Sequence, residues 1–150
     1  MHLKRMKQML QNNRGMTLME ILVVVAIIAL LASVVTTQVT GYLADAKIKT
    51  AKSQIKTFEQ ALELYKAAHD YFPTTEQGLH ALIEKPTVGN IPENYPEDGY
   101  LQKKKIPLDS WGKPYLYISE TGEKFTIISY GADRKEGGTN KGADISSDDL

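Results

Sequence analysis

One carboxylate stands at the start of a long apolar run. Glu20 follows Gly15 by five residues, and from Ile21 to Val35 the only residue that is not apolar is Ser33. Burying an isolated charge in lipid costs at least about 2.5–3.5 kcal/mol. This carboxylate must therefore stay near the membrane interface or acquire a cationic partner, so its position suggests ion pairing as its chemistry.

A second group of carboxylates lies near the end of the chain, in a glycine-rich stretch where no strand is expected. Its members are Asp133, Glu136, Asp144, Asp148 and Asp149. Calcium takes six to eight oxygen ligands from carboxylates, carbonyls and water, and glycines let a loop fold such oxygens inward. The spacing does not match an EF-hand loop, so the residues alone leave two interpretations open: an ion site or a solvated acidic tail.

Composition excludes several classes of protein. The 150 residues carry no formal net charge, and residues 16–150 hold 14 basic against 18 acidic side chains, which is not the balance of a nucleic-acid-binding protein. The absence of cysteine excludes disulfides, thiolate metal sites and a cysteine nucleophile. No G-x-S-x-G, H-E-x-x-H or phosphate-binding glycine loop is present, so the sequence also argues against a membrane-anchored enzyme.

The element that positions Glu20 is predicted to be a membrane anchor. Residues 16–35 are 20 residues long, about 30 Å as a helix, which matches one hydrocarbon core. The preceding residues 1–15 hold four basic side chains and no acid, which predicts a cytoplasmic amino terminus. A secretory signal peptide is the alternative, but Leu31-Ala32-Ser33 is a poor cleavage site and no turn signal follows it.

Beyond the anchor the apolar residues take a helical period. Spacings of four and three connect Ala44, Ile48, Ala51, Ile55, Phe58, Leu62 and Tyr65. With no proline before Pro73, this pattern predicts one helix from about Thr17 to His69, amphipathic in its second half. A coiled coil would also fit such a stripe, but the stripe is short, which favours packing against the chain's own domain.

The remaining residues, 71–150, are predicted to form a small globular domain. The stretches IPLDSWGKPYLYIS and EKFTIISY suggest two strands joined at Thr121–Glu123. Thr75 is a candidate cap for a short helix that contains Leu79. The loop 85–100 is predicted to be packed rather than extended as a linker, because it contains the large side chains of Ile91, Tyr95 and Tyr100.

The order of features at the amino terminus resembles the class III signal of type IV prepilins and type II secretion pseudopilins. The residues that carry it are Arg14-Gly15, Thr17-Leu18 and Glu20, directly before the apolar run. The resemblance implies that a prepilin peptidase cuts between Gly15 and Met16, methylates the new amino terminus at Met16, and leaves the anchor on the mature chain. It also implies that Thr17 and Glu20 act in assembly, with the Met16 amine as the partner of the Glu20 carboxylate.

Two further stretches, YFPTTEQGL at 71–79 and DSWGKPY at 109–115, look like those of major pseudopilins of the type II secretion system. The resemblance implies an α+β, type IV pilin-like fold, in which a long amino-terminal helix packs on a small antiparallel sheet and a carboxy-terminal loop binds an ion. The implied segments are a leader (1–15), a transmembrane and fibre-core helix (16–37), an amphipathic helix (38–70) and a periplasmic domain (71–150) that ends in the loop 130–150.

In that family the last loop binds one calcium ion. By resemblance the side-chain ligands would be Asp133 and Asp144, and the backbone carbonyls of Tyr130 and Lys135 would complete the protein's share, with Asp148 as a further candidate.

The function implied is structural. Copies of the chain would leave the inner membrane and polymerise into a periplasmic pseudopilus that drives folded proteins across the outer membrane. The implied partners are further copies of the chain, minor pseudopilins, the prepilin peptidase and the inner-membrane assembly platform. The resemblance implies a single-pass protein with a cytoplasmic amino terminus and no catalysis of its own. A minor pseudopilin or a type IV pilin subunit is the alternative.

Overall fold

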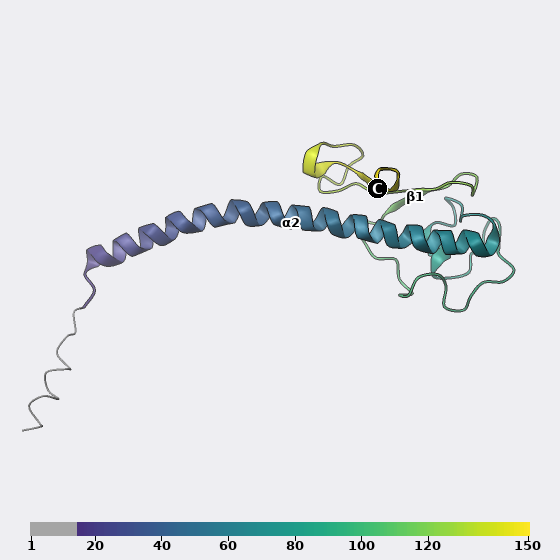
Figure 1. The fold of residues 1–150 in the computed structure, drawn as a ribbon, viewed down its shortest axis with the longest axis horizontal. Helices are drawn as coiled ribbons and strands as arrows, with labels where there is room; N and C mark the ends of the chain where they lie inside the picture. The colour runs from purple at the N-terminus through teal and green to yellow at the C-terminus, as the bar shows by residue number, and fades with distance from the viewer. Residues whose placement is uncertain (1–14) are drawn as a thin grey trace, which may run out of the picture. The chain divides into compact units, whose positions relative to one another are not determined.

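The structure, a computed structural model, describes residues 15–150, without the side chains of residues 34–38. Nearly all of the predicted leader 1–15 therefore lies outside the described residues. The main element is the helix α2, Leu18–His69, whose bounds match the predicted helix to within one residue (Figure 1). The other elements are η1 (Leu79–Leu82), β1 (Leu116–Ile118), β2 (Thr126–Ser129), η2 (Asn140–Gly142), β3 (Ile145–Ser146) and η3 (Ser147–Asp149).

The chain divides into two units, residues 1–41 and residues 42–150. In the first unit the apolar side chains of α2 have no core to enter: Leu18, Ile28 and Leu30 are 76%, 60% and 68% exposed. No helix that the structure describes is both long and apolar enough to cross a membrane. The spanning segment over residues 16–37 stays a prediction.

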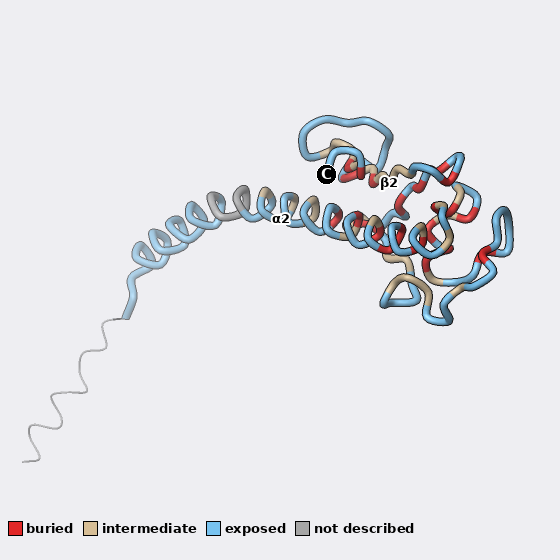
Figure 2. The backbone as a smooth tube through the Cα atoms, turned by 45° about the vertical axis from the view of Figure 1, so that its right-hand side comes forward, coloured by how far each residue is buried: buried red, intermediate tan, exposed pale blue. Residues whose placement is uncertain are grey.

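In the second unit α2 supplies one side of a hydrophobic core, as its periodicity predicts. Five residues of the predicted stripe are at most 2% exposed, and Figure 2 shows the buried positions gathered in this unit; they are Ala51, Ile55, Phe58, Leu62 and Tyr65. Ala44 and Ile48, at the start of the stripe, are only partly buried. Full burial of a side chain such as Ile, Leu or Phe contributes about 1.5–3 kcal/mol to the free energy of folding. This face therefore packs on its own domain, and the coiled-coil alternative is not needed.

The sheet that covers this helix is small and antiparallel, with the strand order β1-β2-β3. Tyr117 pairs with Ile127 across the first two strands, so the predicted hairpin is confirmed. The third strand corrects the prediction that the carboxy-terminal stretch contains none, because Ile145 pairs with Ser129. A two-residue strand has too little pattern of its own to be recognised in a sequence.

One local prediction about the domain is wrong, and a second is confirmed except at one residue. Thr75 does not cap η1, because Gly78 holds that position without a side-chain hydrogen bond. The Thr75 hydroxyl instead accepts a hydrogen bond from the backbone N–H of Ser119, at 2.8 Å. In the loop 85–100, Tyr95 and Tyr100 pack against the core as predicted, but Ile91 remains 49% exposed.

Candidate functional site

The amino-terminal site occupies the first turn of α2. The Thr17 hydroxyl accepts a hydrogen bond from the backbone N–H of Glu20, at 3.2 Å, and so caps the helix. A carboxylate in the first turn is stabilised by the positive end of the helix dipole. Met16 directly precedes this cap and is exposed, as is Glu20. Met16 and Glu20, the predicted ion pair, thus lie four positions apart in the sequence, at the exposed start of the helix.

The second site is the loop between β2 and β3, which folds around a pair of glycines. The Asp133 Oδ1 atom accepts a hydrogen bond from the backbone N–H of Lys135, at 3.2 Å. A Cβ atom added at Gly138 would lie 2.6 Å from the Asp133 Oδ2 atom and would collide with the carbonyl of Gly142. The positive φ of Gly138, 92°, is also a conformation that glycine adopts readily. Only glycine fits beside this carboxylate.

Asp144 reaches the same pair of glycines from the other end of the loop. Its Oδ2 atom accepts a hydrogen bond from the backbone N–H of Gly137, at 2.9 Å, and its own N–H donates to the Gly137 carbonyl, at 3.2 Å. Its Oδ1 atom is buried without a hydrogen-bond partner. An unpaired buried carboxylate oxygen is costly, so this atom is suited to a cation.

For the remaining ligand candidates, the described residues show no hydrogen bond to Asp144, and only Lys135 bonds to Asp133. Tyr130 follows β2 directly, and Lys135 lies in the turn that Asp133 closes. The carboxylate of Asp148 instead accepts a hydrogen bond from the Thr126 hydroxyl, at 3.2 Å. Among the described residues no three His, Asp or Glu side chains form a group that could hold a metal. A site in this loop would have two carboxylates and would depend on backbone carbonyls or water.

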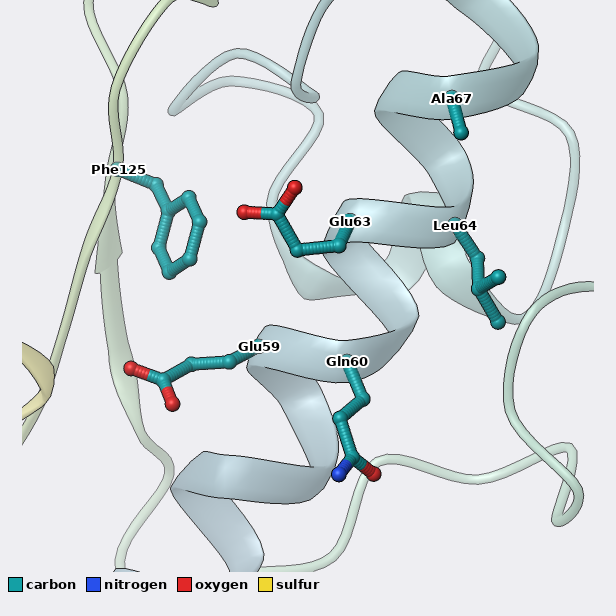
Figure 3. A pocket seen from close by; sticks show the side chains of 6 residues that line it. All are labelled: Glu59, Gln60, Glu63, Leu64, Ala67 and Phe125. Atoms are coloured by element: carbon teal, nitrogen blue, oxygen red, sulfur yellow. The ribbon is translucent and has the colours of Figure 1, made fainter.

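A third feature, which sequence reasoning did not find, is an open groove between α2 and the residue just before β2. Glu59, Gln60, Glu63, Leu64, Ala67 and Phe125 line it (Figure 3). Leu64 is 60% exposed, and the partly buried Glu59 forms an ion pair with the exposed Lys56, at 3.0 Å. The groove thus combines apolar and acidic side chains. Phe125 comes from just before β2, so helical periodicity alone could not have placed it there.

The segment that contains Lys103, Lys104 and Lys105 lies on another side of the same helix. Before it, the Tyr100 hydroxyl is hydrogen-bonded to the His69 ring, at 2.7 Å; after it, the Ser110 hydroxyl donates to the Lys47 carbonyl, at 2.8 Å. At 3.6 residues per turn, these two helix positions lie about 120° and about 160° around α2 from Glu63 in the groove. All three lysines are exposed.

Comparisons with known proteins match both regions of the chain. The family model described as "Type II secretion system (T2SS), protein G" matches residues 38–148, and the model "Prokaryotic N-terminal methylation motif" matches residues 10–36. The chain belongs to the type II secretion system protein G family. The predicted resemblance to this family is confirmed.

Two bacterial relatives resemble the chain over most of their length. The chain is 46% identical to the type II secretion system core protein G of Pseudomonas aeruginosa, covering 87% of this chain and 92% of that protein. It is 44% identical to the protein of the same name from Vibrio cholerae, covering 93% and 94% of the two chains.

A solved structure gives the same family. The crystal structure of the major pseudopilin from enterohaemorrhagic Escherichia coli matches with a TM-score of 0.61 and 34% identity, covering 74% of this chain and 94% of that one. The predicted α+β, pilin-like fold is therefore confirmed. These names favour the major subunit over the alternative of a minor pseudopilin or a type IV pilin.

Proposed function

We propose that this chain is the major structural subunit of a periplasmic pseudopilus, which drives folded proteins across the outer membrane. The observation that carries the proposal is the amino-terminal half of α2: its apolar side chains are exposed and its first turn bears the carboxylate of Glu20. A helix of this kind needs lipid before assembly and copies of itself afterwards. Removal of the leader after Gly15 by a prepilin peptidase fits the methylation motif over residues 10–36.

Cleavage would supply the cation that Glu20 needs. The new amino group would belong to Met16, four residues before the carboxylate, and in a stack of subunits a neighbour's amine could serve as well. A buried ion pair contributes little net stability, but it can fix register, because one charge left unpaired is strongly unfavourable. We expect this pair to set how far each subunit is displaced from the next.

Two surfaces of the folded unit are proposed to meet between neighbouring copies, although Glu59 pairs with Lys56 and Lys104 pairs with Asp98 within the chain. The acidic groove at Glu59 and Glu63 and the lysine segment 103–105 lie on different sides of α2. A contact that joins two different surfaces leaves one of each free in a dimer, and repeated copies form a helical filament if the rotation does not close. Self-association of this kind fits a fibre subunit.

The carboxy-terminal loop is proposed to hold one calcium ion. The carboxylates of Asp133 and Asp144 would bind it, together with the backbone carbonyls of Tyr130 and Lys135. The unpaired Oδ1 atom of Asp144 and the glycine-only space beside Asp133 support this assignment. When bound, the ion would neutralise the two carboxylates and hold the loop closed; it takes no part in a reaction.

The proposal places the chain in the inner membrane as a single-pass protein, with its amino terminus in the cytoplasm and its domain in the periplasm. Its other partners would be the minor pseudopilins and the assembly platform of the inner membrane. The chain would catalyse nothing itself.

Neutralising Glu20 tests the assembly proposal. Glu20→Gln should abolish the fibres that the overproduced protein forms at the cell surface, measured by electron microscopy and in the sheared fraction. Glu120→Gln is the matched control, because Glu120 is also exposed but lies in the turn between β1 and β2; this variant should assemble normally. Fibres of normal number from the Glu20 variant would contradict the proposal.

Calcium titration tests the ion site. A ligand at about 100 times its Kd raises the free energy of unfolding by about 2.7 kcal/mol, and Asp133→Asn should remove most of this gain while changing little in chelator. Asp148→Asn should keep the gain, because that carboxylate is engaged by Thr126. Melting curves of the full chain in detergent measure both, and an equal calcium response in all three proteins would exclude the site.

A further inference from the structure

Asp109 is a buried carboxylate that lies outside both sites. It is 6% exposed and is the only charged side chain among the buried polar residues that the structure describes. Its Oδ1 atom accepts hydrogen bonds from the backbone N–H groups of Trp111 and Lys113, at 3.0 and 2.8 Å. Its Oδ2 atom accepts a hydrogen bond from the hydroxyl of Ser129, at 2.6 Å. The first two bonds close a turn, whereas the third reaches a different element.

Ser129 stands at the base of the carboxy-terminal loop. It is the last residue of β2 and pairs with Ile145, the residue that follows Asp144. Its hydroxyl also accepts a hydrogen bond from the backbone N–H of Gly131, at 3.4 Å. A Cβ atom at Gly131 would lie only 2.7 Å from the Ala143 carbonyl. The two ends of the loop therefore meet where the Ser129 side chain holds the backbone.

The same turn is tied to α2 on its other side. The hydroxyl of Ser110, the residue after Asp109, donates to the Lys47 carbonyl at 2.8 Å. Because Ser129 has one hydroxyl proton and gives it to the carboxylate, its lone pairs remain free to accept from Gly131. The turn at Asp109 and Ser110 thus connects the helix, through Ser110, with the first residues of the loop, through Ser129.

We propose that Asp109 is a positioning residue for the ion loop: through the hydroxyl of Ser129 it fixes the base of the loop, so that Asp133 and Asp144 are held against Gly137 and Gly138 before an ion arrives. The role of the ion rests on the proposed function. Without this anchor the loop would still close, but it would have to be ordered by the ion itself, and some of the binding free energy would be lost.

Two buried serines allow a matched test. Ser129→Ala removes the link to the loop, whereas Ser119→Ala removes a hydroxyl that is similarly buried and donates to the Lys124 carbonyl within the hairpin, at 2.8 Å. The probe is calcium alone, titrated into the full chain in detergent. Trp111, the only tryptophan, reports on the turn through its fluorescence. We expect Ser129→Ala to raise the calcium midpoint about tenfold, the effect typical of residues that orient ligands, and Ser119→Ala to leave it unchanged.

Asp109→Asn should shift the calcium midpoint less than Ser129→Ala, because its amide oxygen can still accept from both backbone N–H groups while its NH2 group donates to the serine oxygen and keeps part of the link. Equal midpoints for the wild type and Ser129→Ala, or equal shifts for the two serine variants, would overturn the proposal.

A second measurement separates this proposal from the ion site. In chelator, trypsin should cleave the loop at Arg134 and Lys135 faster in Ser129→Ala than in the wild type or in Ser119→Ala. If the wild type shows no response to calcium but this difference in cleavage is found, the ion site fails and the positioning role stands. If calcium binds the wild type and the calcium midpoints agree in all variants, the positioning role fails alone.

Discussion

The two halves of α2 differ in what covers their apolar side chains. Apolar residues dominate the amino-terminal half and are exposed, as with Ile28 at 60%, whereas the carboxy-terminal half carries a single apolar stripe in which Ile55 and Leu62 are fully buried. Burial of apolar surface is the main stabilising term in folding. The carboxy-terminal half therefore obtains its stability from its own domain, and the amino-terminal half must obtain it from lipid or from other copies of the chain.

This contrast determines where mutations should act. A buried residue in the carboxy-terminal half should affect the folding of the single chain, whereas a residue in the amino-terminal half should affect only what the chain does with its surroundings. Phe58 is an example of the first kind, and Glu20 of the second.

The largest expected effect comes from the buried stripe. Phe58→Ala should lower the free energy of unfolding by about 3–5 kcal/mol, because it empties the space beside Tyr115, whose ring lies 5.3 Å from that of Phe58. Ile28→Ala should change it by less than about 0.5 kcal/mol. Urea unfolding of the full chain in detergent, followed by Trp111 fluorescence, measures both. A comparable loss of unfolding free energy in Ile28→Ala would show that the two halves of α2 do not differ in this way.

The groove beside Phe125 extends the comparison to the exposed residues in the carboxy-terminal half of α2, which should act only between copies. Glu63→Lys should reduce fibre yield strongly, because the groove would then repel the lysine segment, while the unfolding free energy of the single chain stays within about 0.5 kcal/mol. Lys104→Glu should have the same effect alone and should restore fibres when combined with Glu63→Lys. A double variant that assembles no better than either single variant would remove this contact.

The sequence predicted well whatever depends on a repeating pattern. The stripe from Ala51 to Tyr65 is buried as expected, because helical spacing alone decides which side chains share a face. The choice of Asp133 and Asp144 rested on a family resemblance, and the structure places Asp133 beside Gly138 and Asp144 against Gly137.

What the sequence could not predict depends on contacts between distant residues. Thr75 has the chemistry of a helix cap, but a backbone N–H 44 residues away takes its hydroxyl. The pairing of Ile145 with Ser129 and the place of Phe125 in the groove likewise exist only after the sheet has formed on the helix. The hydrogen bond between Asp109 and Ser129 is another such contact, because no pattern of residue spacing predicts it.

The smallest effect should come from the end of the packed half of α2. Burial beside Tyr65 and Tyr100 lowers the pKa of His69 below its usual value, and nearby Asp70 opposes this only to a lesser extent. The unfolded chain therefore takes up a proton near the usual histidine pKa of about 6.5, while the folded chain resists protonation until a lower pH. The contribution to stability is complete above that value and is lost as the pH falls towards the folded pKa.

His69→Gln should reduce this loss, because the amide can still bond to the Tyr100 hydroxyl but does not titrate. Melting temperatures measured at about pH 7.5 and about pH 5.5 test it, since these values lie on either side of the usual histidine pKa. The exposed His80 provides the control, and His80→Gln should keep the full difference between the two conditions. The melting temperatures of the wild type and of His69→Gln could also fall by the same amount between the two conditions. In that case the environment of His69 does not govern the pH response, and this end of α2 is insensitive to acid.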